Sequence, residues 1–477
     1  MREEPTMRPN LTALATRREM LRSTALGFGW LALADLLATE SRAAETGRSG
    51  RPDPLALKKP HFEPKAKRVI FLFMHGGPSQ VDTFDYKPKL AEHDGKPLPF
   101  AKPRVVSGPT GNLLKSPFAF KQYGQSGAWV SELFPHIGSK ADELCFIKSM
   151  HGSNSRHGGA LLELHTGSDT FVRPSMGSWV TYGLGTENRD LPGYLTICPT
   201  LSHGGVNNYS SAFLPAAYQA TPLGSAGAPI NQVTVPFVKG TTPAAQQRLE
   251  LDLLAGLESE RAGGADAATD GRLQSFEMAF RMQNTAPAVQ DLSKESAETL
   301  KLYGIDDKVT ESFGRQCLMA RRYSEAGVRF VQCSHSYKWD QHENLKKDHT
   351  SNAREVDKPI AGLLTDLKAR GLLKDTLVIW AGEFGRTPVA QGKDGRDHNP
   401  HAFTIFLAGG GVKAGFSLGA TDEYGYYATE DKVHIHDLHA TILHLLGLNH
   451  EKLTYKHAGR DFRLTDVHGN VVKEIIA

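Results

Sequence analysis

Five short segments of the chain bring together side chains that metal and phosphate chemistry uses. They contain histidine, aspartate, glutamate or arginine, beside glycine in every segment except 334–343, and they occupy residues 75–85, 151–159, 334–343, 382–388 and 395–401. Imidazole and carboxylate groups suit zinc, manganese and similar divalent ions, and guanidinium groups suit an oxyanion such as phosphate or sulfate. Each segment alone is weak evidence. Their recurrence predicts one shared site for a divalent metal and an anionic ester.

The segments supply candidates for each role in such a site. The predicted metal ligands are His75, Asp82, Asp340, His342, Glu383, Asp397 and His398. Zinc or manganese is the expected ion, with calcium as an alternative. The predicted anion-binding residues are Arg156 and Arg386, and the predicted catalytic proton carriers are His157 and His401. Water is preferred to the Ser155 hydroxyl as the nucleophile, and both stay open.

These segments follow or precede apolar runs that predict buried strands. The runs lie at 69–74, 144–147, 194–198, 328–333, 376–380 and 403–407. Near-continuous apolarity is typical of strands covered on both faces, so the expected fold class is α/β, with a mostly parallel, doubly wound sheet flanked by helices. Apolar periodicity over 356–370 and 438–446 predicts two of those helices. In such sheets the loops at the carboxyl ends of the strands carry the chemistry.

The amino terminus predicts export from the cytoplasm. Arg17 and Arg18 precede an apolar stretch at 25–34, which is the layout of a twin-arginine secretory signal. The stretch is shorter than the roughly 20 apolar residues of a membrane-spanning helix, so residues 1–45 are expected to be a cleaved signal peptide. The protein would then act in the periplasm or outside the cell.

The rest of the chain divides by composition. Residues 46–67 are rich in proline and charge, which predicts a linker, and residues 68–477 predict one large α/β domain. The sequence at about 204–306 turns rich first in Gly, Ser, Ala and Pro and then in Ala, Glu and Gln, which predicts a largely helical insertion. The four cysteines are too few and too widely spaced for a disulfide framework, so they are expected in the core.

Charge excludes some partners without naming the substrate. The chain has 55 Lys+Arg against 52 Asp+Glu and a formal net charge of +3, with no basic stripe of the kind that binds nucleic acid. No transmembrane helix is expected in the mature chain. A small-molecule or glycan ester is the expected partner, and the oligomeric state is left open. Four histidines at 434–444 lie at helical spacing, which predicts a structural role for them.

Several stretches resemble a known superfamily. Residues 356–364 and 371–379 are similar to the segment that precedes the metal-binding Asp-His pair of sulfatases and other alkaline-phosphatase-superfamily enzymes, and residues 437–443 are similar to their downstream helix. More closely, residues 75–79, 382–388 and 395–398 resemble the hallmarks of a large exported bacterial family, the sulfatase-like domain of unknown function fifteen-oh-one. The resemblance spans most of 68–477 and implies an alkaline phosphatase/sulfatase-like fold.

The sequence departs from the superfamily pattern at its metal ligands. His75 stands where the first strand usually ends in a metal-binding aspartate, and Glu383-Phe384 stands where Asp-His is usual. Glutamate can replace aspartate as an oxygen ligand, but phenylalanine cannot replace histidine. The loop at 151–159 also lacks the Cys-x-Pro-x-Arg type motif that a formylglycine sulfatase needs.

The leading hypothesis is therefore an exported, metal-dependent hydrolase of phosphate or sulfate esters that does not use formylglycine. The altered ligand set motivates an alternative from another class. This alternative is a non-catalytic sulfatase-like fold that binds an anionic glycan or an envelope partner.

Overall fold

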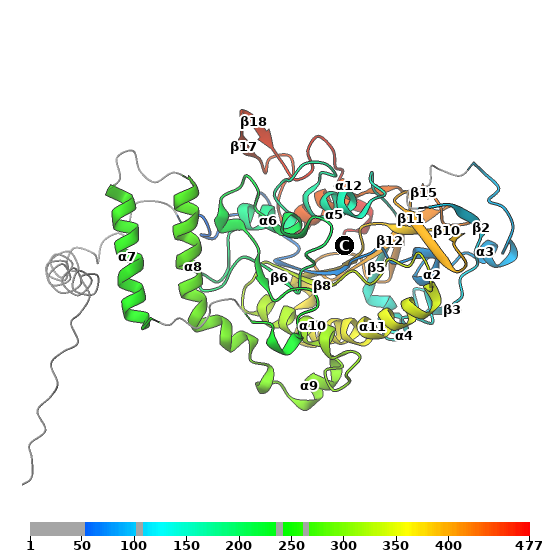
Figure 1. Cartoon of the computed structure of the whole chain (residues 1–477), viewed down its shortest axis with the longest axis horizontal. Coiled ribbons are helices and arrows are strands. Elements are labelled where there is room, and N and C mark those ends of the chain that lie inside the picture. Colours follow the sequence, from blue (N-terminus) through cyan, green and yellow to red (C-terminus); the bar gives the residue numbers. More distant parts are fainter. Residues whose placement is uncertain (1–52, 102–107, 235–241, 261–266) are drawn as a thin grey trace, which may run out of the picture. The chain divides into compact units, whose positions relative to one another are not determined.

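The computed structural model describes residues 53–101, 108–234, 242–260 and 267–477. The predicted signal peptide and the first part of the predicted linker lie outside these residues. Residues 54–477 form one unit, and Figure 1 shows its elements. A search of the described residues finds no helix long and apolar enough to cross a membrane.

A nine-stranded sheet forms the centre of this unit. The strand order is β13-β5-β12-β9-β1-β8-β6-β7, with β16 paired to β5. The strands are β1 (Arg68–Met74), β5 (Leu144–His151), β6 (Tyr194–Ile197), β7 (Thr221–Leu223), β8 (Phe330–His335), β9 (Thr376–Ala381), β12 (Phe403–Ala408), β13 (Phe416–Leu418) and β16 (Val433–His434). The recorded pairings are parallel except those of β12, which runs antiparallel to β5 and β9. The mostly parallel sheet predicted from the apolar runs is confirmed.

Helices flank this sheet, as Figure 1 shows. Two core clusters hold the packing: α10 (Glu311–Glu325) and α11 (Leu345–Ala369) contribute to one, and α5 (His157–Thr166), α6 (Met176–Leu184) and α12 (Ile435–Leu445) contribute to the other. Side chains of β1 alternate between the clusters, since Ile70 and Leu72 join the first while Val69 and Phe71 join the second. Burial on both faces explains why this strand is an unbroken apolar run.

The described residues also form a smaller antiparallel sheet, with the strand order β11-β10-β2. Its strands are β2 (Thr110–Leu113), β10 (Gly385–Gln391) and β11 (Gly395–Asn399), and Arg386 on β10 pairs with His398 on β11. The chain leaves β9 and later enters β12, which runs the opposite way. The β10/β11 hairpin therefore returns the chain to the edge at which β9 ends.

The described part of residues 204–306 is mostly helical but also contributes a strand to the main sheet. β7 pairs in parallel with β6. α7 (Ala244–Glu260) and α8 (Ala267–Gln290) lie side by side (Figure 1), and α9 (Ala297–Leu302) follows them. α8 packs against α10, which joins the helical pair to the α10/α11 side of the sheet.

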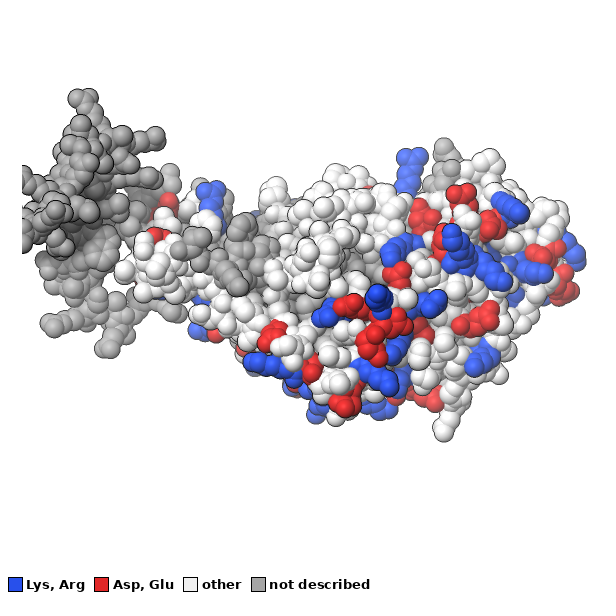
Figure 2. Space-filling view, turned by 60° about the horizontal axis from the view of Figure 1, so that its bottom comes forward, with Lys and Arg blue, Asp and Glu red and all other residues white. Residues whose placement is uncertain are grey.

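Short elements complete the described chain. They include α2 (Gln80–Thr83), α3 (Pro88–Glu92), α4 (Pro135–Gly138), β3 (Phe120–Tyr123), β4 (Ala128–Ser131), β14 (Ala420–Thr421), β15 (Ala428–Glu430), β17 (Tyr455–His457) and β18 (Arg460–Phe462). On the face turned forward in Figure 2, positive and negative side chains are interspersed and form no patch of one sign. This distribution agrees with the balanced charge of the sequence.

Two smaller predictions concern side chains away from the metal-type segments. All four cysteines are free and buried, which confirms their packing in the core. On α12, Nε2 of His436 lies 3.0 Å from the carbonyl oxygen of Gly167, and Nε2 of His439 lies 2.8 Å from that of Leu164. These histidines bind backbone at separate points, as the helical spacing predicts.

Candidate metal centre

Side chains from distant parts of the chain gather at one edge of the main sheet. β1, β5, β6, β8 and β9 run in the same direction, so their carboxyl ends meet there. His75 follows β1, His203 follows β6, Asp340 follows β8 and Glu383 follows β9, while His157 opens α5 after β5. The strand topology alone therefore brings these five residues to one place.

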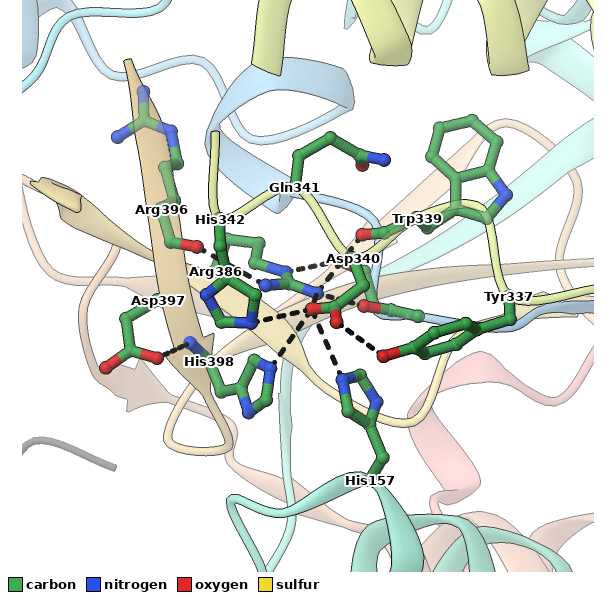
Figure 3. A network of polar contacts seen from close by, with 12 residues as sticks. His157, Tyr337, Trp339, Asp340, Gln341, His342, Arg386, Arg396, Asp397 and His398 are labelled. Carbon is green, nitrogen blue, oxygen red and sulfur yellow. Dashed lines mark hydrogen bonds and ion pairs between the residues drawn. The ribbon is translucent and has the colours of Figure 1, made fainter. Parts of the chain in front are cut away.

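Asp340 is the centre of the cluster, and Figure 3 shows three imidazole rings turned toward it. The Nε2 atoms of His342, His398 and His157 lie 2.9, 3.1 and 3.2 Å from its Oδ1 atom. Burial by itself raises the pKa of the Asp340 carboxyl, but its contacts with these histidines outweigh burial and hold that pKa well below the ordinary value. Asp340 is therefore ionised throughout the neutral range.

Two further groups orient the Asp340 carboxylate. Nη2 of Arg386 lies 2.6 Å from Oδ1, and the Tyr337 hydroxyl donates to Oδ2 at 2.7 Å. Tyr337 has a φ of 29°, in the left-handed region that residues with a side chain seldom occupy. Its ring lies against His75, with centroids 4.8 Å apart. This backbone conformation of Tyr337 thus places its ring against His75 and its hydroxyl against Asp340.

His157 joins Asp340 to a second carboxylate. Its Nδ1 atom lies 2.7 Å from Oε1 of Glu383, and the buried Glu383 also accepts the backbone N–H of Gly76. Burial alone lowers the pKa of His157, but the two carboxylates outweigh burial and raise it to about 9. Burial raises the pKa of Glu383, but the hydrogen bond with His157 outweighs it and lowers this pKa to about 2. At neutral pH His157 is a cation between two carboxylates.

Three overlapping groups of side chains could each hold an ion. In each group the candidate ligand atoms lie within 4.8 Å of one another, and the groups are His75, His157 and His203; His157, Asp340 and His398; and His342, Asp397 and His398. Such imidazole and carboxylate donors suit zinc or manganese. The structure thus brings together six of the seven predicted ligands, if Glu383 is counted through its contact with His157.

His75 offers a nitrogen that has no partner within the described part of the chain. It is fully buried, and burial lowers its pKa to about 4, so its ring is neutral at pH 7. Its Nδ1 atom has no hydrogen-bond partner among the described residues, while Nε2 lies 3.4 Å from Nδ1 of His203. A neutral imidazole of this kind is in the protonation state that binds a metal.

Asp82, the seventh predicted ligand, is engaged elsewhere. Its Oδ2 lies 2.6 Å from Nε of Arg396, and its Oδ1 accepts from Nη2 of the same residue at 3.2 Å. Ser79 donates its hydroxyl to the same carboxylate, and both charged side chains are fully buried. We therefore leave Asp82 out of the proposed ligand set, because its oxygens are already taken.

The two predicted anion-binding arginines differ in position. Arg156 is exposed and immediately precedes α5. Arg386 is fully buried, and it donates to the carbonyl oxygens of Gly77 at 2.9 Å and Trp339 at 3.2 Å in addition to its contact with Asp340. Arg386 is therefore turned into the protein, where it supports the ligand loops and does not face an incoming anion.

The other predicted catalytic residues, Ser155 and His401, lie in different parts of the structure. The carbonyl oxygen of Ser155 accepts a hydrogen bond from Nδ1 of His398 at 2.8 Å, so the backbone of Ser155 contacts the cluster. The exposed His401 packs against Tyr427, with ring centroids 5.3 Å apart. Among the described residues, His401 contacts Asn399, Ala428 and two tyrosines, and no contact with Asp340 is found.

Phe384 fills the position where the superfamily pattern has histidine. Its ring is stacked on His398 with centroids 4.5 Å apart and lies 4.9 Å from His157. Gly77 makes room for it, because a Cβ atom there would come within 2.6 Å of the Phe384 ring. Phe384 is an apolar wall that holds two candidate ligand rings, and His157 supplies a nitrogen beside Asp340 that phenylalanine cannot.

Sequence reasoning missed two members of the cluster, His203 and Tyr337. His203 lies next to the segment interpreted as an insertion, although it follows an apolar strand and precedes two glycines, as His75 does. Its ring centroid is 4.9 Å from that of His157 and 4.7 Å from that of Tyr337. The glycine-spaced histidine after β6 was the available signal. Nothing in the sequence singles out Tyr337, whose position depends on an unusual φ.

Comparison with known proteins gives one family match. The model of the family described as Protein of unknown function (DUF1501) matches residues 66–476. A search of the curated proteins finds no match.

The chain is also similar to several solved structures at low identity. The lipoteichoic acid synthase LtaP from Listeria monocytogenes is 11% identical, over 86% of this chain and 78% of that chain, with a TM-score of 0.37. The PsFucS1 sulfatase from Pseudoalteromonas sp. is 13% identical, over 89% and 72%, with a TM-score of 0.34. An alkaline phosphatase from the Antarctic bacterium TAB5 is 11% identical, over 81% and 99%, with a TM-score of 0.34.

Proposed function

We propose, from the premise that this chain belongs to the family described as Protein of unknown function (DUF1501), that it is a metal-dependent hydrolase of phosphate or sulfate esters. One observation carries the proposal, namely the convergence of three imidazole nitrogens on a single carboxylate oxygen of Asp340.

His398 shows why this convergence favours a metal. Its Nδ1 donates to the carbonyl oxygen of Ser155, so a neutral His398 presents a bare Nε2 to Asp340 at 3.1 Å. Burial is the main cause that lowers the pKa of His398 and favours the neutral ring. Two lone pairs that face each other repel, and a metal ion held between them would remove this repulsion. Neighbouring ligands of a tetrahedral zinc lie about 3.3 Å apart if each is about 2.05 Å from the ion, close to the spacing found here.

The chain's own residues then have separate tasks. Asp340, His342 and His398 would hold an ion, and His157 would join them after losing its proton. Glu383 would keep the His157 ring in place through the 2.7 Å contact at Nδ1. A divalent ion there would supply Lewis-acid polarisation of an ester oxygen. His203 and Tyr337 are partly exposed and lie against the buried histidines, so an ester would approach over them.

The site of action is part of the same proposal. The twin arginines at 17 and 18 and the apolar stretch after them support export by the twin-arginine pathway to the periplasm or beyond. Replacing both arginines by lysine should retain the protein in the cytoplasm, which cell fractionation would detect. Equal export of this variant would argue against the pathway.

Metal analysis of the purified protein, combined with a screen of aryl phosphates and aryl sulfates, tests the hydrolase proposal. We expect bound zinc or manganese and turnover that chelation removes. Asp340→Asn and His398→Gln should lose both, while His468→Gln, at an exposed histidine outside the cluster, should keep both. Absence of bound metal together with absence of turnover under every added divalent ion would contradict the proposal.

A second candidate is a non-catalytic fold that binds an anionic ligand. Arg386 favours it, because a guanidinium 2.6 Å from Asp340 already balances that carboxylate without an ion. Binding of sulfated or phosphorylated glycans by the protein, retained in Asp340→Asn at unchanged affinity and without turnover in either form, would support this candidate over the hydrolase.

A further inference from the structure

A cleft of about 480 Å³ lies between α11, α4 and residues 307–310. α4 packs beside α11, as Figure 1 shows. Sites for small organic ligands commonly have volumes of roughly 300–1,000 Å³, so the cleft is large enough for such a ligand. No candidate metal ligand of the described chain lines it. The cleft is therefore made of other residues than the metal centre.

Phe118 and Leu133 supply buried apolar surface to the cleft, and each is 7% exposed. Asp357 also lines the cleft and is buried. Its Oδ1 atom accepts the backbone N–H of Ile137 at 2.7 Å, and its Oδ2 atom accepts that of His136 at 2.9 Å. Both oxygens of this carboxylate are thus paired, so its charge does not exclude an anion from the cleft.

One wall of the cleft carries a row of positive side chains on α11. The row consists of Lys346, Thr350, Arg354 and Lys358, each four residues after the one before it. Positions four residues apart lie on the same face of a helix. The row contains no acidic residue, and like charges on neighbouring turns destabilise a helix. An anion bound along the row would relieve this repulsion.

Two of these cations have no partner within the described part of the chain. Lys346 and Arg354 are exposed, and neither forms an ion pair or a side-chain hydrogen bond with another described residue. Lys358 makes one contact of this kind, with Asp306 at 3.5 Å. A guanidinium group with free N–H donors matches the two oxygens of a carboxylate or phosphate group.

The acidic residues that line the cleft differ from these cations because they have partners. Glu132 accepts the backbone N–H of Ala119 at 3.2 Å, and Asp307 accepts that of Val309 at 2.9 Å. Asp357 is paired with α4, as described above. The charges left without a partner in the cleft are therefore positive.

We infer that this cleft binds an amphipathic organic anion, which is a compound with one carboxylate, sulfonate or phosphate group and an apolar ring or chain. Arg354 would hold the anionic group, with Lys358 one turn away and Lys346 two turns away on α11. The apolar part would lie toward Phe118 and Leu133. Apolar walls with a few placed polar groups are typical of sites for such ligands. This inference does not depend on the proposed hydrolase activity.

Other anions fit the cleft less well. A nucleic acid or another long polyanion needs many neighbouring cations, whereas three acidic residues line this cleft and the net charge of the chain is only +3. An inorganic ion would leave the apolar surface of the cleft in contact with water. A small amphipathic anion uses both kinds of surface.

Fluorescence titration of the full chain with anilinonaphthalene sulfonate tests the site, because this probe is itself an amphipathic anion. We expect saturable binding at about 10–100 μM, which is typical of a ligand of this size. Arg354→Gln should weaken binding about 10-fold or more, because it removes charge-assisted hydrogen bonds. Lys346→Gln should weaken it about 3-fold. The matched control is Lys347→Gln, at an exposed lysine of α11 outside the cleft, which should leave binding unchanged.

Competition and chelation identify what the cleft recognises. Octanesulfonate and naphthalenesulfonate should displace the probe at lower concentrations than sodium sulfate, and the stronger of the two shows whether a chain or a ring is preferred. Chelation should leave probe binding unchanged, because no candidate metal ligand lines the cleft. Loss of binding on chelation would place the probe at the metal centre and overturn the inference.

The variants also show which result contradicts the inference. Thermal melting establishes that each variant is folded, and if Arg354→Gln is not, Lys346→Gln against Lys347→Gln makes the same comparison. Binding that neither Arg354→Gln nor Lys346→Gln weakens overturns the inference. Displacement by sodium sulfate as strong as that by the organic sulfonates also overturns it, because the apolar surface would then contribute nothing.

Discussion

Asp82 and Asp340 both pair with a buried arginine at 2.6 Å, yet they belong to different kinds of site. Asp82 and Arg396 are both fully buried, and serine and guanidinium donors occupy the carboxylate. Asp340 is 15% exposed, and imidazole nitrogens surround it. What distinguishes a structural carboxylate from a candidate metal ligand is therefore the rest of its surroundings, since the arginine is common to both.

The largest effect should come from breaking the Asp82 pair. Asp82→Asn leaves the Arg396 guanidinium buried without its counter-charge, so the free energy of unfolding should fall by about 3–5 kcal/mol. Denaturant unfolding measures this loss. Replacing both partners, Asp82→Asn with Arg396→Met, should recover part of it. A loss below about 1 kcal/mol would show that the pair is not structural.

The matching change at Asp340 should affect metal more than folding. Asp340→Asn removes the charged oxygen on which three imidazoles converge, and we expect metal affinity to fall at least about 100-fold. Arg386 keeps its backbone acceptors, so the loss of stability should be smaller than for Asp82→Asn. Metal titration and unfolding of the two variants side by side give the comparison. The comparison would be contradicted if Asp340→Asn kept its metal content and lost more stability than Asp82→Asn.

A smaller effect should follow from loosening the support behind Asp340. Glu355 lies 3.0 Å from Nε2 of His335, whose Nδ1 accepts the Trp339 indole N–H at 2.9 Å. Because Trp339 adjoins Asp340, Glu355→Gln should weaken metal binding about 10-fold while leaving the Asp82 pair intact. Metal affinity at fixed pH measures this. The control is Glu187→Gln, which removes an ion pair with Arg329 instead.

The smallest expected effect is a pH dependence on the Asp82 side. His349 is fully buried, and burial lowers its pKa to about 3 despite the nearby Asp82 carboxylate. Above pH 6.5 the ring is neutral in both states, whereas below it the unfolded chain takes up a proton that the folded chain refuses. Stability should therefore fall by about 1 kcal/mol between pH 6.5 and 5.5 from this group. In His349→Gln the free energy of unfolding should fall by about 1 kcal/mol less between pH 6.5 and 5.5 than in the unaltered protein. An unaltered pH dependence would contradict the lowered pKa of His349.

The sequence predicts the sheet better than the site. Runs such as 69–74 are apolar throughout because β1 is covered on both faces, and this signal is local. The end of each strand also predicts where polar residues gather. The direction of β12 cannot be read from its own residues, because it depends on which strands β12 pairs with. This direction brings the β10/β11 hairpin, and His398 with it, back to the edge of the sheet where β9 ends.

Whether a residue can act as a candidate metal ligand or anion-binding group depends on contacts with residues that lie far from it in the sequence. Asp82 and Asp340 look alike in sequence and both pair with an arginine, which for Asp82 lies 314 residues away. The histidines around Asp340 are what separate the two carboxylates. Arg386 follows a glycine-rich turn as an anion-binding residue would, but the carbonyl acceptors around it turn it inward. His203 and Tyr337 depend on left-handed backbone conformations that the residue types do not announce.

The distance between the cluster's members along the chain bears on when the site can form during synthesis. Glu383 binds Gly76, 307 residues before it, and His157, 226 residues before it. A fragment that lacks the β10/β11 hairpin lacks His398, so it cannot complete the two candidate ion-binding groups that contain this residue. Contacts of such long range form late in folding. Metal loading at these two groups would then come late in maturation, after β10 and β11 have joined the folded sheet.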